Sequence, residues 1–183
     1  IAGKRQGDDP RNTLFMEYVK YIRYFQPKVF VMENVIGLLS MKMNDGNKIV
    51  DVIMKELNDS GYNVSYYKIL ASEYDVPQNR RRVFFIGFRN DLEINPSIPE
   101  PLSSGVPVGS ILVNKKEVPR SYFLSDRAVE GIKKRREKMK AKKYGFGAQF
   151  LKLDKPSYTI PARYWKDGYD ALVRYSDDDI RRL

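Results

Sequence analysis

The chain has 183 residues, of which 42% are hydrophobic, and it carries a formal net charge of +10. It contains no cysteine and no histidine, which excludes disulfide bonds, Cys/His zinc sites, a thiol nucleophile and an imidazole base within these residues. No apolar run approaches the roughly 20 residues that cross a bilayer, and the polar start lacks a secretory signal. The positive charge favours a polyanionic partner, nucleic acid before membrane, and a basic solvated surface is the simpler alternative.

The first predicted elements are a helix and a strand. The helix starts near Asp8-Asp9-Pro10, where Asp caps the N-terminus and Pro fits the first turn, and it closes at Pro27. After it, the apolar run from Val29 to Met32 predicts a buried strand that ends in Glu33 and Asn34. Open α/β sheets place their chemistry where strands end, so Glu33 is predicted to be a functional carboxylate. The expected apolar face of the helix consists of Leu14, Phe15, Tyr18, Val19, Ile22 and Phe25.

A second helix and two more strands follow. The helix is expected to stop at Gly61, and its inward residues are Ile49, Val50, Ile53 and Leu57. An extended segment at 62–66 and a buried strand at 83–88 come next, and their short connection predicts an antiparallel pair. Strand 29–33 is expected to pair with strand 83–88 on one side only. Its other edge should be open and able to pair with another chain.

The composition changes after Asp91. Prolines, glycine and serine within 93–107 predict a linker between two bodies. Beyond it, Ser125-Asp126 opens a third helix that is rich in lysine and arginine and is broken at 144–147. Such a helix suits non-specific phosphate binding, and a solvated run of charge is the alternative. Short strand-like pieces are expected near 158–160 and 172–173.

One polar block precedes a buried strand and could carry chemistry. In extended backbone, Gln78, Arg80 and Arg82 point to one side and Arg81 to the other. Arginine binds phosphate and carboxylate bidentately, so this face could hold either, although a simply solvated strand entrance is the alternative. The segment 156–165 could contact DNA or form a small hydrophobic cluster. We recognise no metal-ligand cluster, phosphate-cradling glycine loop or nucleophile–base pair in the sequence.

Four blocks, in this order, resemble those of the DNA cytosine-5 methyltransferases: Gly3-Lys4-Arg5, Asp9-Pro10-Arg11-Asn12-Thr13-Leu14-Phe15, Pro27-Lys28-Val29-Phe30-Val31-Met32-Glu33-Asn34-Val35 and Tyr74-Asp75-Val76-Pro77-Gln78-Asn79-Arg80-Arg81-Arg82. The resemblance covers residue 1 to about residue 90. It is looser beyond, where Thr159-Ile160 resembles a dipeptide of the family's target recognition domain and 181–183 resemble the start of its next block. The family's glycine-rich cofactor strand and its Pro-Cys nucleophile are absent, and the nucleophile is expected just upstream of Ile1.

The resemblance implies a reaction. A cysteine thiolate attacks C6 of a cytosine flipped out of duplex DNA, and C5 then takes the methyl group of S-adenosylmethionine. The resemblance assigns Glu33 the role of supplying a proton or a hydrogen bond to N3 of the base. Arg82 would hold Glu33 and the base carbonyl, and Leu14 would line the cofactor pocket. Lys4 and Arg80 would contact flanking phosphates, and the other expected DNA-binding residues are Asn34, Gln78, Thr159 and Arg163. No metal is expected.

The expected fold is α/β. Residues 1–92 would form the distal half of a Rossmann-like methyltransferase sheet with an antiparallel last strand pair, 93–107 a linker, and 108–183 a small mixed target recognition domain that is incomplete at its C-terminus. The segment alone is expected to be inactive, to bind S-adenosylmethionine poorly and to self-associate through its open sheet edge. Bacterial restriction–modification, in the cytoplasm on nucleoid DNA, is the expected setting. Alternatives are an RNA cytosine-5 methyltransferase homologue, a non-catalytic basic nucleic-acid-binding module, and one half of a split enzyme.

Overall fold

The chain forms two compact units in a computed structural model that describes residues 14–102, 105–141, 149–160 and 171–174. The first unit comprises Ile1–Leu70 and Arg81–Pro101, and the second comprises Ala71–Arg80 and Leu102–Leu183. A short stretch before the last strand of the first unit therefore belongs to the second unit. The expected domain limits, 1–92 and 108–183 with a linker at 93–107, stay a prediction.

A three-stranded sheet forms the centre of the first unit. Its strands are β1 (Val29–Val35), β2 (Tyr62–Leu70) and β4 (Arg81–Arg89), in the order β1-β4-β2. Both outer strands run antiparallel to β4, which confirms both predicted pairings. β1 and β2 consequently run in the same direction. β1 is longer than predicted, because its ladder with β4 continues to the pair Val35 and Arg82.

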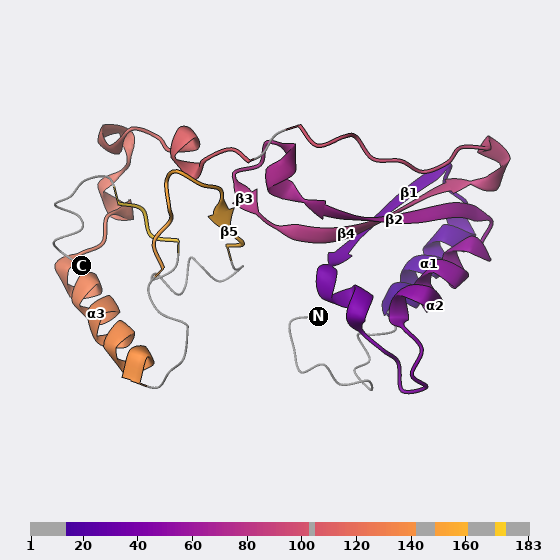
Figure 1. Cartoon of the computed structure of the whole chain (residues 1–183), viewed down its shortest axis with the longest axis horizontal. Helices are drawn as coiled ribbons and strands as arrows, with labels where there is room; N and C mark the ends of the chain where they lie inside the picture. Colours follow the sequence, from indigo (N-terminus) through magenta and orange to yellow (C-terminus); the bar gives the residue numbers. More distant parts are fainter. Residues whose placement is uncertain (1–13, 103–104, 142–148, 161–170, 175–183) are drawn as a thin grey trace. The chain divides into compact units, whose positions relative to one another are not determined.

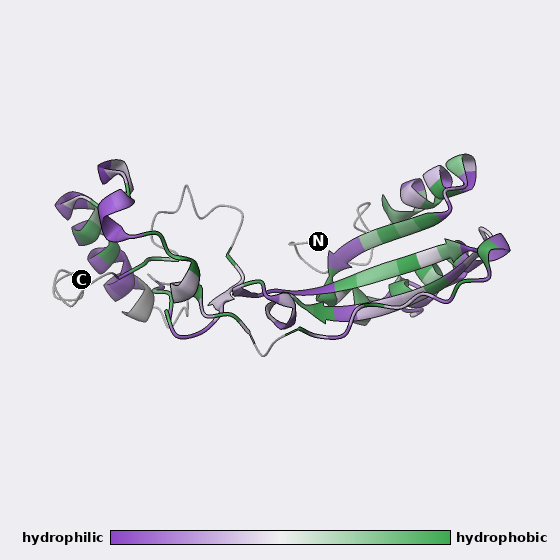
Figure 2. Ribbon diagram, turned by 90° about the horizontal axis from the view of Figure 1, so that it is seen from above, coloured by the Kyte–Doolittle hydropathy of each residue, from purple (hydrophilic) through white to green (hydrophobic). Residues whose placement is uncertain are grey.

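Two helices cover one face of this sheet (Figure 1). They are α1 (Leu14–Phe25) and α2 (Ile49–Asn58). All four predicted inward residues of α2 are buried, and Gly61 adopts a φ of 92° just beyond the helix, a left-handed conformation that glycine takes without steric cost. Figure 2 shows that the strands of this unit are mostly hydrophobic. The buried core consists of Val19, Ile22, Phe30, Leu38, Ile49, Val50, Ile53, Leu57, Tyr62, Val64, Val83 and Phe85.

The predicted apolar face of α1 is too wide. Val19 and Ile22 are 1% and 4% exposed, but Leu14 and Phe25 are 60% and 65% exposed. At 100° per residue, the last two lie on the flank of the helix, roughly a quarter turn from the direction that Val19 and Ile22 share. Phe25 instead contacts the exposed ring of Tyr24, with 4.8 Å between ring centroids.

The other face of the sheet is partly covered by the chain that follows β4. The Asn63 side chain donates to the carbonyl of Ile94 at 3.2 Å, and the Tyr67 hydroxyl donates to the carbonyl of Pro96. β1 is not buried on both faces, contrary to what its continuous apolar run predicted. Val29 and Val31 are 41% and 55% exposed on this side. The described residues supply β1 with one strand partner, β4, so its other edge is open among them.

The second unit contains one long helix and short extended pieces. The helix α3 (Asp126–Ala141) starts where predicted, and the Ser125 hydroxyl accepts a 3.3 Å hydrogen bond from the Ala128 N–H. β3 (Gln78–Asn79) pairs in parallel with β5 (Ser157–Tyr158), and Phe150 forms an isolated bridge with Leu172. Within the described ranges, no helix is long and apolar enough to cross a membrane.

Candidate active site

Glu33 and Arg82 form an ion pair across two neighbouring strands. The register places Glu33 opposite Phe84 and Val35 opposite Arg82. Alternate residues of a strand share a face, so Glu33 and Arg82 are diagonal neighbours on one side of the sheet. The Nε of Arg82 lies 2.7 Å from the Oε1 of Glu33, and its Nη1 donates to the carbonyl of Arg81 at 2.8 Å. The predicted partnership of these two residues is present in the structure.

The two members of the pair differ in exposure. The side chain of Arg82 is 18% exposed, whereas that of Glu33 is 45% exposed. The Arg81 carbonyl accepts a hydrogen bond from the Arg82 guanidinium, and the charge-assisted contact of 2.7 Å fixes the carboxylate of Glu33. Glu33 therefore combines a fixed position with access from outside, which a carboxylate needs in order to exchange a hydrogen bond or proton with a bound molecule.

Asn34 follows Glu33 but faces the other side of the sheet. It shares that side with its opposite residue Val83, which is buried. The Oδ1 of Asn34 accepts a 2.8 Å hydrogen bond from the N–H of Val35, so this oxygen supports the local backbone. Glu33 and Asn34, neighbours in the predicted site, thus lie on opposite faces of β1.

The block Gln78–Arg82 is not one extended strand, contrary to the prediction. β3 ends at Asn79 and β4 begins at Arg81. Between them, the N–H of Arg80 donates to the carbonyl of Gln78 at 2.9 Å, and the Arg80 carbonyl accepts from the N–H of Ala71 at 3.0 Å. These bonds turn the backbone, so side-chain alternation is not continuous from Gln78 to Arg82. Gln78 and Arg80 belong to the second unit and Arg82 to the first.

Within the second unit, the structure brings Thr159 to the Gln78 block. Gln78 pairs with Ser157, and the Thr159 hydroxyl donates to the carbonyl of Asn79 at 2.9 Å. The side-chain oxygen of Asn79 also lies 3.0 Å from the Ser72 hydroxyl, which donates to it. Asn79 is thus a connecting residue that the sequence reasoning missed. Its residue type was the available sequence signal. A short polar side chain, such as that of Asn, in a loop that carries a motif often forms a hydrogen bond with nearby backbone groups.

The remaining predicted site residues contribute less to the described geometry. Leu14 is the first described residue of α1 and is 60% exposed. Lys4 and Arg163 lie outside the described residues. Among the residues that the structure places, no group of three His, Cys, Asp or Glu could hold a metal ion. A shallow pocket of about 510 Å³ in the first unit contains none of the predicted residues and is lined by Asn58, Tyr62, Asn63, Asn90, Glu93, Ile94 and Asn95.

The comparison with protein families decides the membership of this chain. The model of the C-5 cytosine-specific DNA methylase family matches residues 1–180. The chain belongs to this family. The resemblance stated from the four sequence blocks is therefore confirmed.

Curated relatives are type II methyltransferases of bacteria. M.HpaII of Haemophilus parainfluenzae is 39% identical over 158 residues, which cover 84% of this chain and 43% of the relative. M1.ScrFI of Lactococcus lactis subsp. cremoris is 33% identical over 187 residues, 100% of this chain and 47% of the relative. The chain spans about half the length of such relatives. It spans 25% of M.DdeI of Desulfomicrobium norvegicum, to which it is 45% identical over 103 residues.

Solved structures agree on the fold. The S. pombe Dnmt2 methyltransferase aligns with 94% of this chain and 52% of its own, at a TM-score of 0.60 and 16% identity. At that identity the likeness concerns the fold alone. It confirms the predicted class, a mixed α/β fold of the Rossmann-like methyltransferase type.

Proposed function

We propose that the protein containing this chain transfers a methyl group to C5 of a cytosine in duplex DNA. One observation carries the proposal: in a C-5 cytosine-specific DNA methylase, Glu33 is held 2.7 Å from Arg82 while its side chain stays 45% exposed. A carboxylate that is both fixed and accessible suits hydrogen bonding to a ring nitrogen of an inserted base. The relatives M.HpaII and M1.ScrFI, both type II methyltransferases, support the same reaction class.

In this proposal the pair acts on a flipped-out cytosine. Glu33 donates a proton or strong hydrogen bond to N3, which makes C6 more open to attack. Arg82 keeps Glu33 in place and contacts the base carbonyl. Because the chain contains no cysteine, the attacking thiolate has to come from outside these residues, and we propose that the segment alone is inactive. Lys4 and Arg80 bind flanking phosphates, and the further DNA-binding residues are Asn34, Gln78, Thr159 and Arg163.

Methyltransferases of this family use S-adenosylmethionine as the methyl donor. The residues described here do not make a complete site for it. Leu14, the expected contact, is 60% exposed, and one leucine side chain cannot enclose a nucleoside. Leu14 is therefore one proposed lining residue of a pocket that other residues complete.

The test is a substitution of Glu33 in the complete protein. Glu33→Gln keeps the shape of the side chain but removes the acid, so the rate of methyl transfer from labelled S-adenosylmethionine to duplex DNA should fall by about 10²- to 10⁴-fold. Glu17→Gln is the matched control, because Glu17 is a carboxylate of α1 with a 58% exposed side chain. Full activity of Glu33→Gln would contradict the assigned role.

The same assay separates the alternatives. Methylation of RNA but not of duplex DNA by the wild-type protein would favour the RNA-directed homologue. No methyl transfer to either, with DNA binding retained, would favour a non-catalytic binding module. Activity that appears only on mixing with a second polypeptide would indicate a split enzyme. The bacterial sources of the type II relatives support a setting in restriction–modification, in the cytoplasm on nucleoid DNA.

We also propose that the 183-residue chain, taken alone, self-associates through β1. The support is the open edge of β1 among the described residues and the exposure of Val29 and Val31 beside it. An apolar strand edge offers unpaired N–H and carbonyl groups to another chain. Light scattering across a concentration series should show a mass that rises with concentration. A constant monomer mass would refute self-association.

A further inference from the structure

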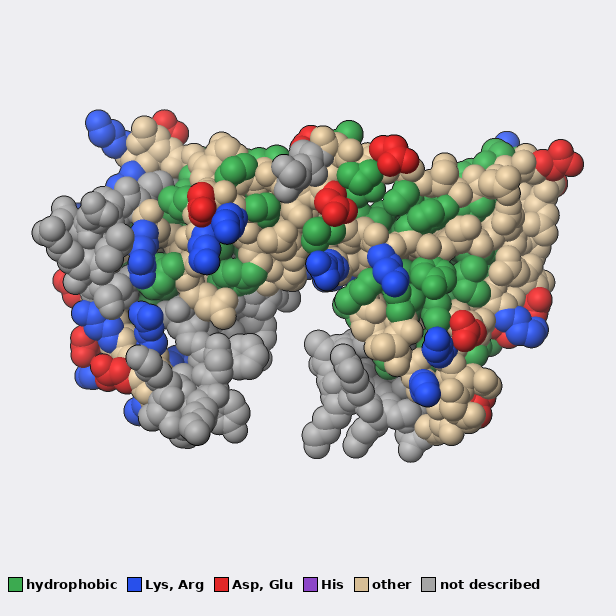
Figure 3. Space-filling model, viewed as in Figure 1, with side chains coloured by type: hydrophobic (Ala, Val, Ile, Leu, Met, Phe, Trp, Pro, Cys, Tyr) green, Lys and Arg blue, Asp and Glu red, His purple; other side chains and the backbone are tan. Residues whose placement is uncertain are grey.

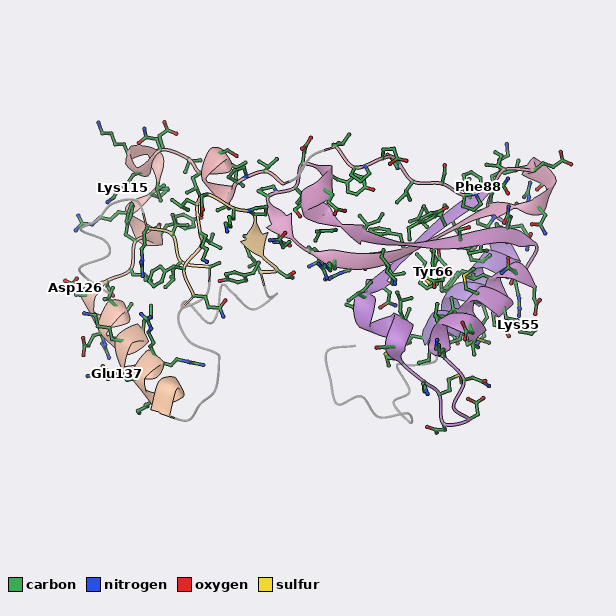
Figure 4. The ribbon with its side chains drawn as sticks, viewed as in Figure 1. Lys55, Tyr66, Phe88, Lys115, Asp126 and Glu137 are labelled. Carbon is green, nitrogen blue, oxygen red and sulfur yellow. The ribbon has the colours of Figure 1, made fainter. Side chains whose placement is uncertain are left out.

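The helix α3 has a small buried apolar side. Val129 and Ile132 are 9% and 8% exposed, and they lie three residues apart on one side of the helix. Its outward residues are mostly charged, and Figure 2 shows the helix as mostly hydrophilic. Figure 4 shows Asp126 at the start of α3 and Glu137 nearer its end. Cations lie on every side of this helix, whereas its acidic residues gather on one flank.

One side of α3 carries three cations and a glycine in a row. Arg127, Gly131, Lys134 and Lys138 follow one another at spacings of four, three and four residues, which places them on a single face. We call these four residues the basic strip. It extends about 16 Å along the helix axis. The acidic residues Asp126, Glu130 and Glu137 fall on the neighbouring flank rather than in the strip.

The lysine at the centre of the strip is accessible. The side chain of Lys134 is 70% exposed, and its Nζ lies 3.7 Å from the Oε1 of Glu130, which is longer than a hydrogen bond. Such an exposed pair contributes little and is readily exchanged for a stronger anionic partner. Figure 3 shows blue Lys and Arg side chains, with red acidic side chains among them, over the part of the second unit that contains α3.

Gly131 lies in the middle of the strip, where glycine is a poor choice for the helix itself. Glycine in a helix interior is less stable than alanine because it loses more backbone entropy on folding. A Cβ built on Gly131 would meet no heavy atom within 4 Å among the described residues. Internal packing within that part of the chain therefore does not require a glycine here. The missing side chain leaves the helix backbone open to close approach from outside, between cations on both sides.

We propose that the basic strip of α3 binds the phosphate backbone of duplex DNA and that Gly131 lets a strand approach the helix closely. The inference rests on the proposed function and adds to it a sequence-independent contact surface. A membrane surface fits less well, because interfacial helices expose large apolar side chains opposite their cations. The apolar residues of α3 named above are buried instead.

The first test measures binding of a fluorescent duplex by the complete protein, without S-adenosylmethionine, over a series of salt concentrations. Each phosphate contact contributes about 1 to the slope of log affinity against log salt. Lys134→Ala/Lys138→Ala should therefore reduce the slope by about 2. The loss should be equal for duplexes with and without the methylated sequence. Lys20→Ala/Lys55→Ala, the same charge change on α1 and α2, should leave the slope unchanged.

The second test uses the glycine. Gly131→Ala should raise the unfolding midpoint, because alanine favours the helix, and should at the same time weaken duplex binding. A higher unfolding midpoint together with weaker duplex binding would identify a surface that is kept open for a ligand. A raised midpoint with unchanged DNA affinity would overturn the role of Gly131.

The outcomes separate this inference from the proposed function. If the strip variants bind and methylate duplex DNA as the wild type does, only the inference fails. If the wild type does not methylate duplex DNA at all, the proposed function fails. A slope that changes for duplex RNA but not for duplex DNA would also overturn the strip as a DNA-binding surface.

Discussion

Thr159 donates a 2.9 Å hydrogen bond from its hydroxyl to the backbone carbonyl of Asn79, 80 positions earlier in the chain. The bond continues the parallel pair in which Asn79 lies beside Tyr158. Asn79 is followed by one turn residue and then by β4, the strand that holds Arg82. The segment expected to recognise DNA is thus attached to the backbone that leads into the Glu33–Arg82 pair.

Removing the Thr159 hydroxyl should loosen this attachment. Thr159→Val loses the donor, and the net loss of one hydrogen bond amounts to about 1 kcal/mol. Hydrogen exchange at the Ser157 amide, which donates to the carbonyl of Pro77 at 2.9 Å, should become faster. Thr159→Ser retains the hydroxyl and should exchange at the wild-type rate. Equal exchange in the valine and serine variants would show that the hydroxyl does not hold this pair.

Arg82→Lys should impair methyl transfer although it preserves the charge. A lysine ammonium lacks the planar fork that bonds Glu33 from Nε and the Arg81 carbonyl from Nη1. If the proposed function holds, displacement of Glu33 should lower kcat/KM on duplex DNA by about a hundredfold. Arg81→Lys is the control, because the exposed Arg81 is the adjacent residue of β4. Comparable losses in both variants would argue against a specific role of Arg82.

Gly87→Ala should destabilise the first unit. A Cβ on Gly87 would lie 2.2 Å from Cε1 of Phe30, the residue opposite it on β1. The Phe30 ring has little room to move, since it packs edge-on against Tyr18 and Tyr62 at centroid distances of 6.1 and 5.2 Å. Overpacking of this kind costs about 1 to 3 kcal/mol in the free energy of unfolding, measured with urea.

Two further variants test that explanation. Gly37→Ala, where a Cβ meets nothing within 4 Å among the described residues, should change the free energy of unfolding much less. Phe30→Leu combined with Gly87→Ala should recover part of the loss, because the smaller side chain frees the space. Additive losses in the double variant would show that Phe30 is not the obstacle.

The ion pair between Arg89 and Asp91 should make stability depend on pH. The hydrogen bond from Arg89, 2.7 Å from Nε to Oδ1, holds the pKa of Asp91 below its ordinary value of 3.8. A lowered folded-state pKa means that the stabilisation is fully present above the unfolded pKa and is lost as the pH falls through the folded pKa. The wild type should exceed Asp91→Asn in free energy of unfolding near neutral pH, and the difference should shrink below about pH 4.

The size of this effect should be small and sensitive to salt, because the pair is solvent-exposed. Urea unfolding of both proteins at low and high ionic strength checks it. A difference between wild type and Asp91→Asn that does not change with pH would contradict the assignment to ionised Asp91.

Several features of this protein could be predicted from the local sequence pattern alone. The spacing of Ile49, Val50, Ile53 and Leu57 predicted the buried side of α2 because helical periodicity is a property of neighbouring residues. Gly61 marked the end of that helix for the same reason, since its φ of 92° depends on its own missing Cβ. The order of the motif blocks predicted the family, and the short connection predicted the antiparallel strands.

The other features depend on pairings between segments that are distant in the sequence. Glu33 lies inside β1 and reaches Arg82 diagonally because the register of two strands places them so, and no local pattern contains that register. The exposure of Leu14 and Phe25 depends on where the sheet meets α1. Gln78 and Arg82 belong to different units because β3 pairs with β5 and not with a neighbour of β4. Side-chain chemistry could be read along the chain, whereas the contacts that give it a role depend on long-range packing.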